Sequence, residues 1–135
     1  MYHVYLSLGT NLGNRKRNIR EAIEKIGEQI GVVDRQSALY ETKPWGYSSP
    51  NDFINSCVLV FTTMAPRQVL EATQRIEREM GRTLKSVDGE YHDRIIDIDI
   101  LMIDDLVINE PDLHVPHPLM EERDFVMKPL KEILR

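Results

Sequence analysis

One apolar run in the last third of the chain carries two acidic residues at alternate positions. Residues 94–102 read Arg-Ile-Ile-Asp-Ile-Asp-Ile-Leu-Met, a pattern typical of an interior β-strand. Because a strand alternates its faces, Asp97 and Asp99 point the same way, roughly 6.5–7 Å apart along the chain. Neighbouring carboxylates repel each other and lose hydration, and a divalent cation removes both costs. The pair therefore predicts a Mg²⁺ site.

A plainer explanation of the acidic pair stays open at this level. Both carboxylates could lie at a strand end and face water, or pair with Arg94 and Arg82. Most surface acids have little effect on stability or function, so a pair of acids in an arbitrary strand favours this second explanation. The neighbouring motifs have to decide between the two.

The size and charge of the chain exclude several classes of protein. Its 135 residues suit one compact domain spanning 1–135, and the 41% hydrophobic content is ordinary for a globular protein. A formal net charge of −5 argues against a nucleic-acid partner but leaves room for a nucleotide. Cys57 is the only cysteine, so no internal disulfide forms and a cytoplasmic location is expected. No apolar stretch approaches the length of a membrane span, and we expect a monomer.

Hydrophobic periodicity divides the chain into alternating strands and helices. Strands are expected at residues 2–8, 32–41, 53–63, 94–102 and 106–109. One helix is expected from the N-cap Asn14 to Gly31, a second from Pro66 to Gly81, and a closing helix at 125–134. The order βαββαβ predicts an α+β fold of the ferredoxin-like type, an antiparallel sheet with two helices on one face and a C-terminal extension. We expect the other face to be open and to line a cleft.

A second dense motif surrounds His117. The run Val115-Pro-His-Pro118 lies in a segment, 111–118, that we expect to be a loop, and its prolines restrict the backbone on both sides of the imidazole. Arg123 and Phe125 follow shortly after it. Taken alone, a histidine that merely caps a helix is the better explanation of this motif.

Seven motifs, in order along the chain, together resemble one enzyme family. They are Leu8-Gly-Thr-Asn11, Glu41-Thr-Lys-Pro-Trp-Gly46, Phe53-Ile-Asn55, Thr73-Gln-Arg-Ile-Glu77, Gly81-Arg82, Arg94-Ile-Ile-Asp-Ile-Asp99 and Val115-Pro-His-Pro118. The family is 6-hydroxymethyl-7,8-dihydropterin pyrophosphokinase, which transfers pyrophosphate from ATP to a pterin alcohol in folate biosynthesis and releases AMP. The resemblance covers nearly the whole chain and implies the same fold that the periodicity predicts.

The resemblance also implies roles for individual residues. Asp97 and Asp99 match the pair that holds two Mg²⁺ ions on the ATP phosphates. The residues that match ATP contacts are Gln74, Arg82, Lys85, Arg94, Ile100, His117 and Arg123. Those that match pterin contacts, with the two phenylalanines as stacking faces, are Thr42, Trp45, Phe53, Asn55, Asp97 and Phe125. The catalytic set implied in this way is Arg82, Arg94 and Asp97.

These roles also make physical sense without the family. Phosphoryl-type transfer needs positioning and charge neutralisation more than covalent help, and guanidinium groups match phosphate geometry well. A flat heterocycle with polar edges needs stacking faces and in-plane hydrogen bonds, and the Asn55 amide offers both a donor and an acceptor.

The chain departs from the family pattern in the charged segment that precedes Arg94 and at two later positions. Tyr91-His-Asp93 stands where the family usually shows Trp, Gly and Pro, and the preceding loop, 83–90, is slightly long. We expect this loop to act as a lid over ATP, with Lys85 an approximate match for a second cation. Asp112 and Glu121 stand where some relatives carry cations, so weaker nucleotide binding is expected.

Two other functions and several structural roles compete with this interpretation. A ferredoxin-like binding module without catalysis has little reason to place two acids beside Arg94. A metal-dependent phosphohydrolase or nuclease usually needs more metal ligands, and the acidic charge disfavours a nucleic-acid substrate. Among single residues, Phe53 could belong to the core, Phe125 could dock a helix, and Gln74 and Glu77 could lie on a solvated helix face.

Overall fold

A computed structural model describes residues 1–44, 49–81 and 95–134 of the chain. The elements run, in order, β1 (Tyr2–Thr10), α1 (Arg15–Gln29), β2 (Val32–Gln36), β3 (Tyr40–Thr42), β4 (Phe53–Thr62), α2 (Pro66–Glu79), β5 (Asp97–Ile103), β6 (Ile108–Glu110), β7 (Leu113–Val115), the 3₁₀ turn η1 (Met120–Glu122) and α3 (Asp124–Ile133). None of the helices in these ranges is long and apolar enough to cross a membrane.

The expected elements are present, with two differences. The strand predicted at 32–41 is divided into β2 and β3, and the segment predicted as a loop, 111–118, contains β7. β7 forms a hairpin with β6, in which Ile108 lies opposite Val115. Asn14 caps α1 as predicted, since its side-chain oxygen accepts a hydrogen bond from the N–H of Arg17 at 3.1 Å.

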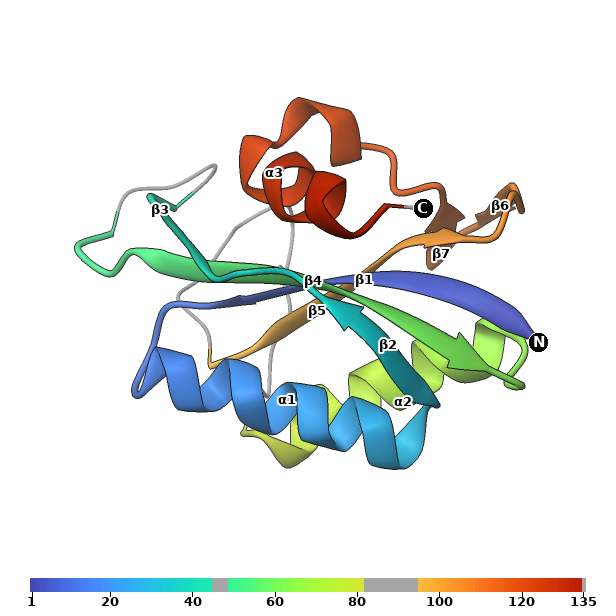
Figure 1. Cartoon of the computed structure of the whole chain (residues 1–135), viewed down its shortest axis with the longest axis horizontal. Helices are drawn as coiled ribbons and strands as arrows, with labels where there is room; N and C mark the ends of the chain where they lie inside the picture. Colours follow the sequence, from blue (N-terminus) through green and yellow to red (C-terminus); the bar gives the residue numbers. More distant parts are fainter. Residues whose placement is uncertain (45–48, 82–94, 135) are drawn as a thin grey trace.

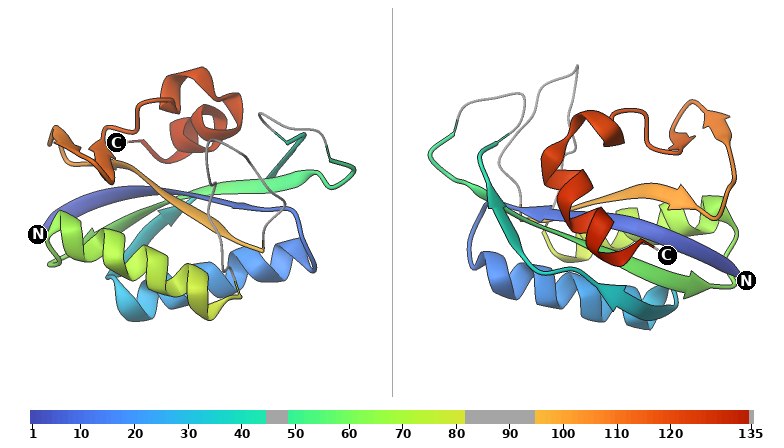
Figure 2. Two further views of the ribbon diagram at one scale, coloured as in Figure 1. Left: turned by 180° about the vertical axis from the view of Figure 1, so that it is seen from behind. Right: turned by 45° about the horizontal axis from the view of Figure 1, so that its top comes forward.

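The main sheet is antiparallel, with strand order β2-β4-β1-β5 and β3 paired to the other end of β4. α1 and α2 cover one face of this sheet, and α3 lies over the other (Figures 1 and 2). β1 pairs with β4 along its whole length, from Tyr2 opposite Thr62 to Thr10 opposite Ile54. The helix-side core is built from one stripe of each helix and the facing strand residues, including Ile19, Ala22, Ile26, Val69, Ile76, Leu6, Leu8 and Ile98.

The second face of the sheet is partly covered, so the expectation of a wholly open face was wrong. A separate hydrophobic cluster fills the space under α3 and consists of Tyr5, Cys57, Leu59, Leu101, Met120, Val126, Leu130 and Ile133. Its apolar side chains come partly from β1, β4 and β5 and partly from the C-terminal extension, and packing between them removes both sets from water. Cys57 is buried in this cluster, and burial raises the pKa of its thiol to about 12. The residues of β1, β4 and β5 beyond this cluster, Gly9, Asn55 and Asp97 among them, form the candidate site.

The acidic strand β5 lies at the end of the strand order, so the prediction of an interior strand was also wrong. The pattern misled because β5 is apolar for another reason: α2 packs beneath it and the segment that follows β7 covers it. The N–H of His117, for example, donates to the carbonyl of Leu101 at 2.9 Å. A register shift opposite Tyr5 and Leu6 places both Leu101 and Met102 on the α3 side and returns Ile103 to the helix-side core.

Gly31 ends the first helical segment for a different reason from the one predicted. The left-handed backbone typical of a glycine after a helix occurs at Gly81, where φ is +93°, while Gly31 is needed because the chain passes close to β4. A Cβ on Gly31 would lie 2.1 Å from the carbonyl oxygen of Phe61. Only glycine allows this approach between the end of α1 and the sheet.

Two glycine substitutions distinguish the effect of this close approach on stability from the effect of ordinary helix propensity. Gly31→Ala forces backbone atoms apart, and we expect the free energy of unfolding to fall by about 3 kcal/mol or more. Gly27→Ala lies inside α1, where nothing is within 4 Å of the added Cβ, and we expect a gain of about 0.5–1 kcal/mol. Urea denaturation of both variants measures the difference. Equal effects of the two substitutions would contradict the packing argument.

Candidate active site

A row of three residues crosses the sheet at the end that α3 leaves uncovered. Gly9 of β1 lies between Asn55 of β4 and Asp97 of β5, because it is the registered partner of both. Two residues further along each strand, a second row is formed by Cys57 of β4, Ser7 of β1 and Asp99 of β5. Residues at alternate positions share a face, so Asn55, Asp97 and Asp99 all lie on the α3 side of the sheet. Strands far apart in the sequence thus bring an amide and two carboxylates onto one surface.

Gly9 leaves a gap in the middle of this surface. A Cβ added to Gly9 would lie 3.3 Å from Oδ1 of Asn55 and 3.6 Å from the ring of Phe53. Any larger side chain would fill the space between the two outer strands. The gap therefore has a backbone floor, an aromatic ring and an amide carbonyl on one side, and the Asp97 strand on the other.

The Asn55 side chain is held in one orientation. It is 3% exposed, and its Nδ2 donates to Oγ1 of Thr42 at 2.7 Å and to the carbonyl of Tyr40 at 3.3 Å. Because both donors are used by β3, the Oδ1 acceptor faces Gly9. Tyr40 in turn donates its hydroxyl to Glu132 of α3, which fixes β3 against that helix. Thr42 and Asn55, both predicted site residues, are in direct contact.

Asp97 and Asp99 fit a hydrated divalent cation. Both are partly exposed while Ile98 between them is buried on the opposite side. Carboxylate oxygens are the ligands that Mg²⁺ prefers, and this ion commonly keeps several waters and binds substrate phosphates. Within the described part of the chain no group of three His, Cys, Asp or Glu side chains forms a closed metal site. The two acids can therefore supply part of a coordination shell that a phosphate ligand completes.

The predicted residues of the C-terminal segment lie near one another. The N–H of Leu119 donates to Nδ1 of His117 at 3.3 Å, so a neutral His117 carries its proton on Nε2. The histidine thus helps to organise the start of η1, as the plainer explanation proposed. The guanidinium carbon of Arg123 lies 5.7 Å from the centre of the Phe125 ring. Phe125 also packs against the α3-side core, so its docking role is real too.

Two predicted ATP contacts lie on the helix side of the sheet. Gln74 is partly exposed on α2, and the Ile100 side chain is 6% exposed in the helix-side core, on the opposite face from Asp97 and Asp99. The remaining predicted site residues, Trp45, Arg82, Lys85 and Arg94, lie outside the described residues. The predicted lid, 83–90, lies there as well.

Polar residues anchor the segment that precedes β4 to the end of β1. Arg15, in the first turn of α1, donates to the carbonyl of Asp52 at 2.9 Å and lies 3.5 Å from a carboxylate oxygen of Glu41. The buried Asn11 donates to the carbonyl of Asn51 at 3.1 Å. A polar cavity of about 350 Å³ lies between these groups. These contacts hold the residues that directly precede Phe53 and Thr42.

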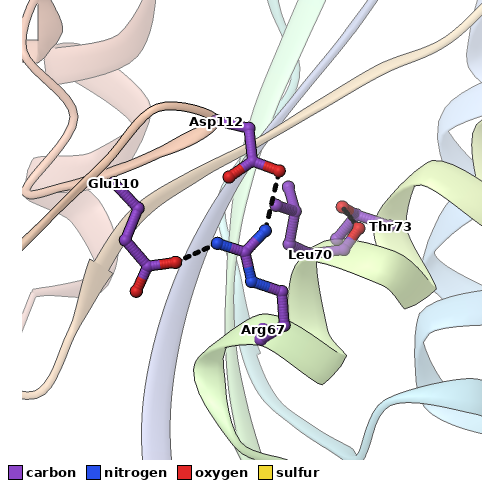
Figure 3. Close-up of polar contacts among 5 residues, drawn as sticks. All are labelled: Arg67, Leu70, Thr73, Glu110 and Asp112. Carbon is purple, nitrogen blue, oxygen red and sulfur yellow. Dashed lines mark hydrogen bonds and ion pairs between the residues drawn. The ribbon is translucent and has the colours of Figure 1, made fainter.

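An ion-pair cluster joins the β6–β7 hairpin to α2. Figure 3 shows the Arg67 guanidinium reaching Glu110 and Asp112, with Leu70 and Thr73 on the same helix. Asp112 is the larger cause of a raised pKa at Arg67, and Arg67 lowers the pKa of Asp112. Asp112 was expected only to weaken nucleotide binding, because it stands where some relatives carry a cation. In the structure its charge is compensated from α2, which also holds the hairpin that leads to His117.

Sequence reasoning missed three parts of this site. Gly9 was named only within the motif Leu8-Gly-Thr-Asn11, although a glycine in a strand is a signal of close approach. Arg67 gave no recognisable signal, because its partners are more than 40 residues away. Glu77 was assigned a motif position but no role, and its alternative on a solvated face was wrong: it is 3% exposed.

Comparison with known proteins identifies the family. The family model of 7,8-dihydro-6-hydroxymethylpterin-pyrophosphokinase matches residues 5–135. The 2-amino-4-hydroxy-6-hydroxymethyldihydropteridine pyrophosphokinase of Porphyromonas gingivalis is 47% identical over 131 residues, which cover 96% of this chain and 89% of that protein. The enzyme of the same name from Bacillus subtilis is 40% identical over 130 residues, covering 96% and 76%. The chain belongs to the 7,8-dihydro-6-hydroxymethylpterin-pyrophosphokinase family.

Solved structures support the fold independently. A crystal structure described as HPPK-DHPS in complex with substrates matches with a TM-score of 0.75 at 16% identity, covering 98% of this chain and 40% of that one. The wild-type HPPK-DHPS of Plasmodium falciparum with pteroate matches with a TM-score of 0.73 at 18% identity, covering 96% and 38%. The chain thus spans about 40% of these longer proteins, and at this identity the likeness concerns the fold alone.

Loss of the Arg67 ion pairs should loosen the hairpin locally. Arg67→Gln removes both charge-assisted contacts, and we expect amide hydrogen exchange in residues 108–115 to rise on the order of two- to fivefold. Arg20→Gln, on an exposed position of α1, serves as the matched control. Unchanged exchange in the hairpin would show that these exposed pairs do not hold it.

Proposed function

We propose that this protein transfers pyrophosphate from ATP to 6-hydroxymethyl-7,8-dihydropterin, giving the pterin diphosphate and AMP, in folate biosynthesis. The observation that carries the proposal is the row Asn55–Gly9–Asp97. The row combines the fixed amide of Asn55, the gap at Gly9, which has no side chain, and the carboxylate of Asp97, which is also one of the acidic pair. This arrangement suits a flat polar ring whose reactive arm reaches a metal–phosphate site.

The pterin side of the site follows from the geometry around Gly9. The inward-facing Oδ1 of Asn55 can accept from an N–H on the ring edge, since its amide donors are occupied by Thr42 and Tyr40. Phe53 borders the gap and offers an aromatic face. Phe125 and the backbone near Trp45 are proposed as the remaining pterin contacts, the first as the opposite stacking face.

The nucleotide side lies between the acidic pair and the C-terminal segment. Two Mg²⁺ ions, when bound with ATP, neutralise phosphate charge and orient the β-phosphate for in-line attack. Asp97 and Asp99 would hold them, and Nε2–H of His117 and the Arg123 guanidinium would donate to the nucleotide. Gln74 and Lys85 are proposed as further ATP contacts, and Ile100, whose side chain is buried in the helix-side core, is proposed to contact ATP only through its backbone.

The chain's own groups then complete the transfer. The hydroxymethyl oxygen of the pterin attacks the β-phosphorus, the bond to the α-phosphate oxygen breaks, and AMP leaves with that oxygen. Asp97 borders both ligands, so its carboxylate can accept the proton of the hydroxymethyl group. Arg82 and Arg94 are proposed to stabilise the charge on the transferring group.

We also infer the finer features that accompany this function. The strand order β2-β4-β1-β5, with two helices on one face, supports the ferredoxin-like arrangement with an added α3. A monomer in the cytoplasm is consistent with the acidic composition and single buried cysteine. A non-catalytic binding module remains disfavoured, because it has no use for the two carboxylates beside the gap.

A product assay tests the proposed function directly. The protein is incubated with ATP, Mg²⁺ and 6-hydroxymethyl-7,8-dihydropterin, and the products are separated by chromatography. We expect AMP and the pterin diphosphate in equal amounts. ADP with a pterin monophosphate, or no turnover at all, would overturn the proposal.

Asp97→Asn should abolish most of this activity. The amide keeps the size of the side chain but loses the charge that binds the metal and the oxygen that accepts the proton, so we expect kcat to fall on the order of 10²-fold or more. Kinetics at several Mg²⁺ concentrations measure the change. Near-normal turnover together with normal Mg²⁺ dependence would remove Asp97 from the mechanism.

Gly9→Ala should weaken pterin binding and leave nucleotide binding nearly unchanged. The added methyl group occupies the gap 3.3 Å from Oδ1 of Asn55, so we expect the pterin KM to rise roughly tenfold while the ATP KM stays within about twofold. Steady-state kinetics with each substrate varied in turn measure both constants. A larger effect on ATP than on pterin would place the heterocycle elsewhere.

A further inference from the structure

A buried carboxylate lies at the outer edge of the acidic strand. Glu77 belongs to α2 and is 3% exposed, and its Oε2 accepts a hydrogen bond from the N–H of Ile98 at 2.8 Å. Ile98 is the residue between Asp97 and Asp99. The contact therefore acts on the backbone at the centre of the candidate metal site, between two acidic side chains that lie on the opposite face of the strand from Ile98.

The direction of this bond explains why α2 has to supply it. In an antiparallel pair, alternate residues direct their N–H groups toward the partner strand and away from it. The N–H of Ile98 points away from β1, and among the described residues β5 is the last strand in the order on that side. Glu77 thus takes the place that a carbonyl of a further strand would occupy.

The bond controls the backbone torsions that aim the two carboxylates. The N–H of Ile98 belongs to the peptide plane that links Asp97 to Ile98, so its direction sets ψ of Asp97 and φ of Ile98. These torsions set the angle between the side chains of Asp97 and Asp99. A strand at the edge of a sheet can twist more easily than an interior strand, and a hydrogen bond from a packed helix restricts that motion.

We propose that Glu77 is a positioning residue for the metal–nucleotide site. It fixes the outer edge of β5 so that Asp97 and Asp99 keep the common orientation that an ion and its phosphate ligand require. The desolvation of a buried carboxylate is offset by its hydrogen bond to the strand. This inference rests on the proposed function only for its effect on ATP, since the restraint of β5 belongs to the ligand-free protein.

The test combines backbone exchange with kinetics for two variants and a control. Glu77→Gln removes the charge, and Glu77→Asp keeps the charge but shortens the reach to Ile98. Glu79→Gln, on the same helix and bonded only at the surface to Lys25 and Gln29, is the matched control. Amide exchange of ¹⁵N-labelled, ligand-free protein is followed at Ile98 and along β4.

We expect the Glu77 variants to affect one strand and one substrate and to leave the others nearly unchanged. In both Glu77 variants, exchange at Ile98 should accelerate about tenfold while that of β4 stays as in the unmodified protein. The KM for ATP measured with Mg²⁺ should rise about tenfold, with the pterin KM within about twofold. Glu79→Gln should change none of these quantities. If one Glu77 variant fails to fold, the other still gives both readouts.

Two outcomes would overturn the inference. Unchanged exchange at Ile98 in Glu77→Gln would show that the bond does not restrain the strand. An equal loss for ATP and pterin, accompanied by faster exchange throughout the sheet, would show a merely structural role. Faster exchange at Ile98 in a protein that forms no pterin diphosphate at all would contradict the proposed function and leave the restraint of β5 standing.

Discussion

Antiparallel pairing of β1 with both β4 and β5 is the constraint on which the site depends. This pairing brings residues that are more than 40 positions apart in sequence into one row, with Gly9 between Asn55 and Asp97. A slip of one residue in either pairing would turn the polar side chains toward the helices. The register is therefore held by burial: Leu6, Leu8, Val58 and Ile98 fill the helix-side core only in this alignment.

The two ends of the α3-side surface serve different purposes. Under α3, the cluster around Leu59, Leu101 and Leu130 is packed and apolar and stabilises the sheet. Beyond it, the same surface carries the polar side chains of Asn55, Asp97 and Asp99, which contacts from other elements help to position. β3 holds the amide of Asn55, and α2 holds the backbone beside the acids. The packed apolar end of this surface thus supports its polar end, which is a common arrangement of binding sites.

Much of the fold was predictable because its signals are local. Asn14 as a helix cap, Pro66 at the start of α2 and the periodic isoleucines of α1 depend on residues within one or two turns. The errors came from long-range packing. β5 looks interior because α2 and the segment at His117 bury it. Gly31 does follow the end of α1 as predicted, but its close approach to β4 was not predictable. Neither cause lies within the pattern of a single segment.

By itself, the sequence determined the types of the elements, the acidic pair and the family resemblance, since each depends on residue identity and order along the chain. The acidic pair, Asp97 and Asp99, was predictable on one face because a strand alternates. Only the tertiary structure decided what lies opposite that face: the gap at Gly9, the orientation of Asn55, and the bond from Glu77 to the acidic strand. These depend on strand register and on the distance between a helix and a sheet edge, which are set by packing of the whole core and by no local pattern.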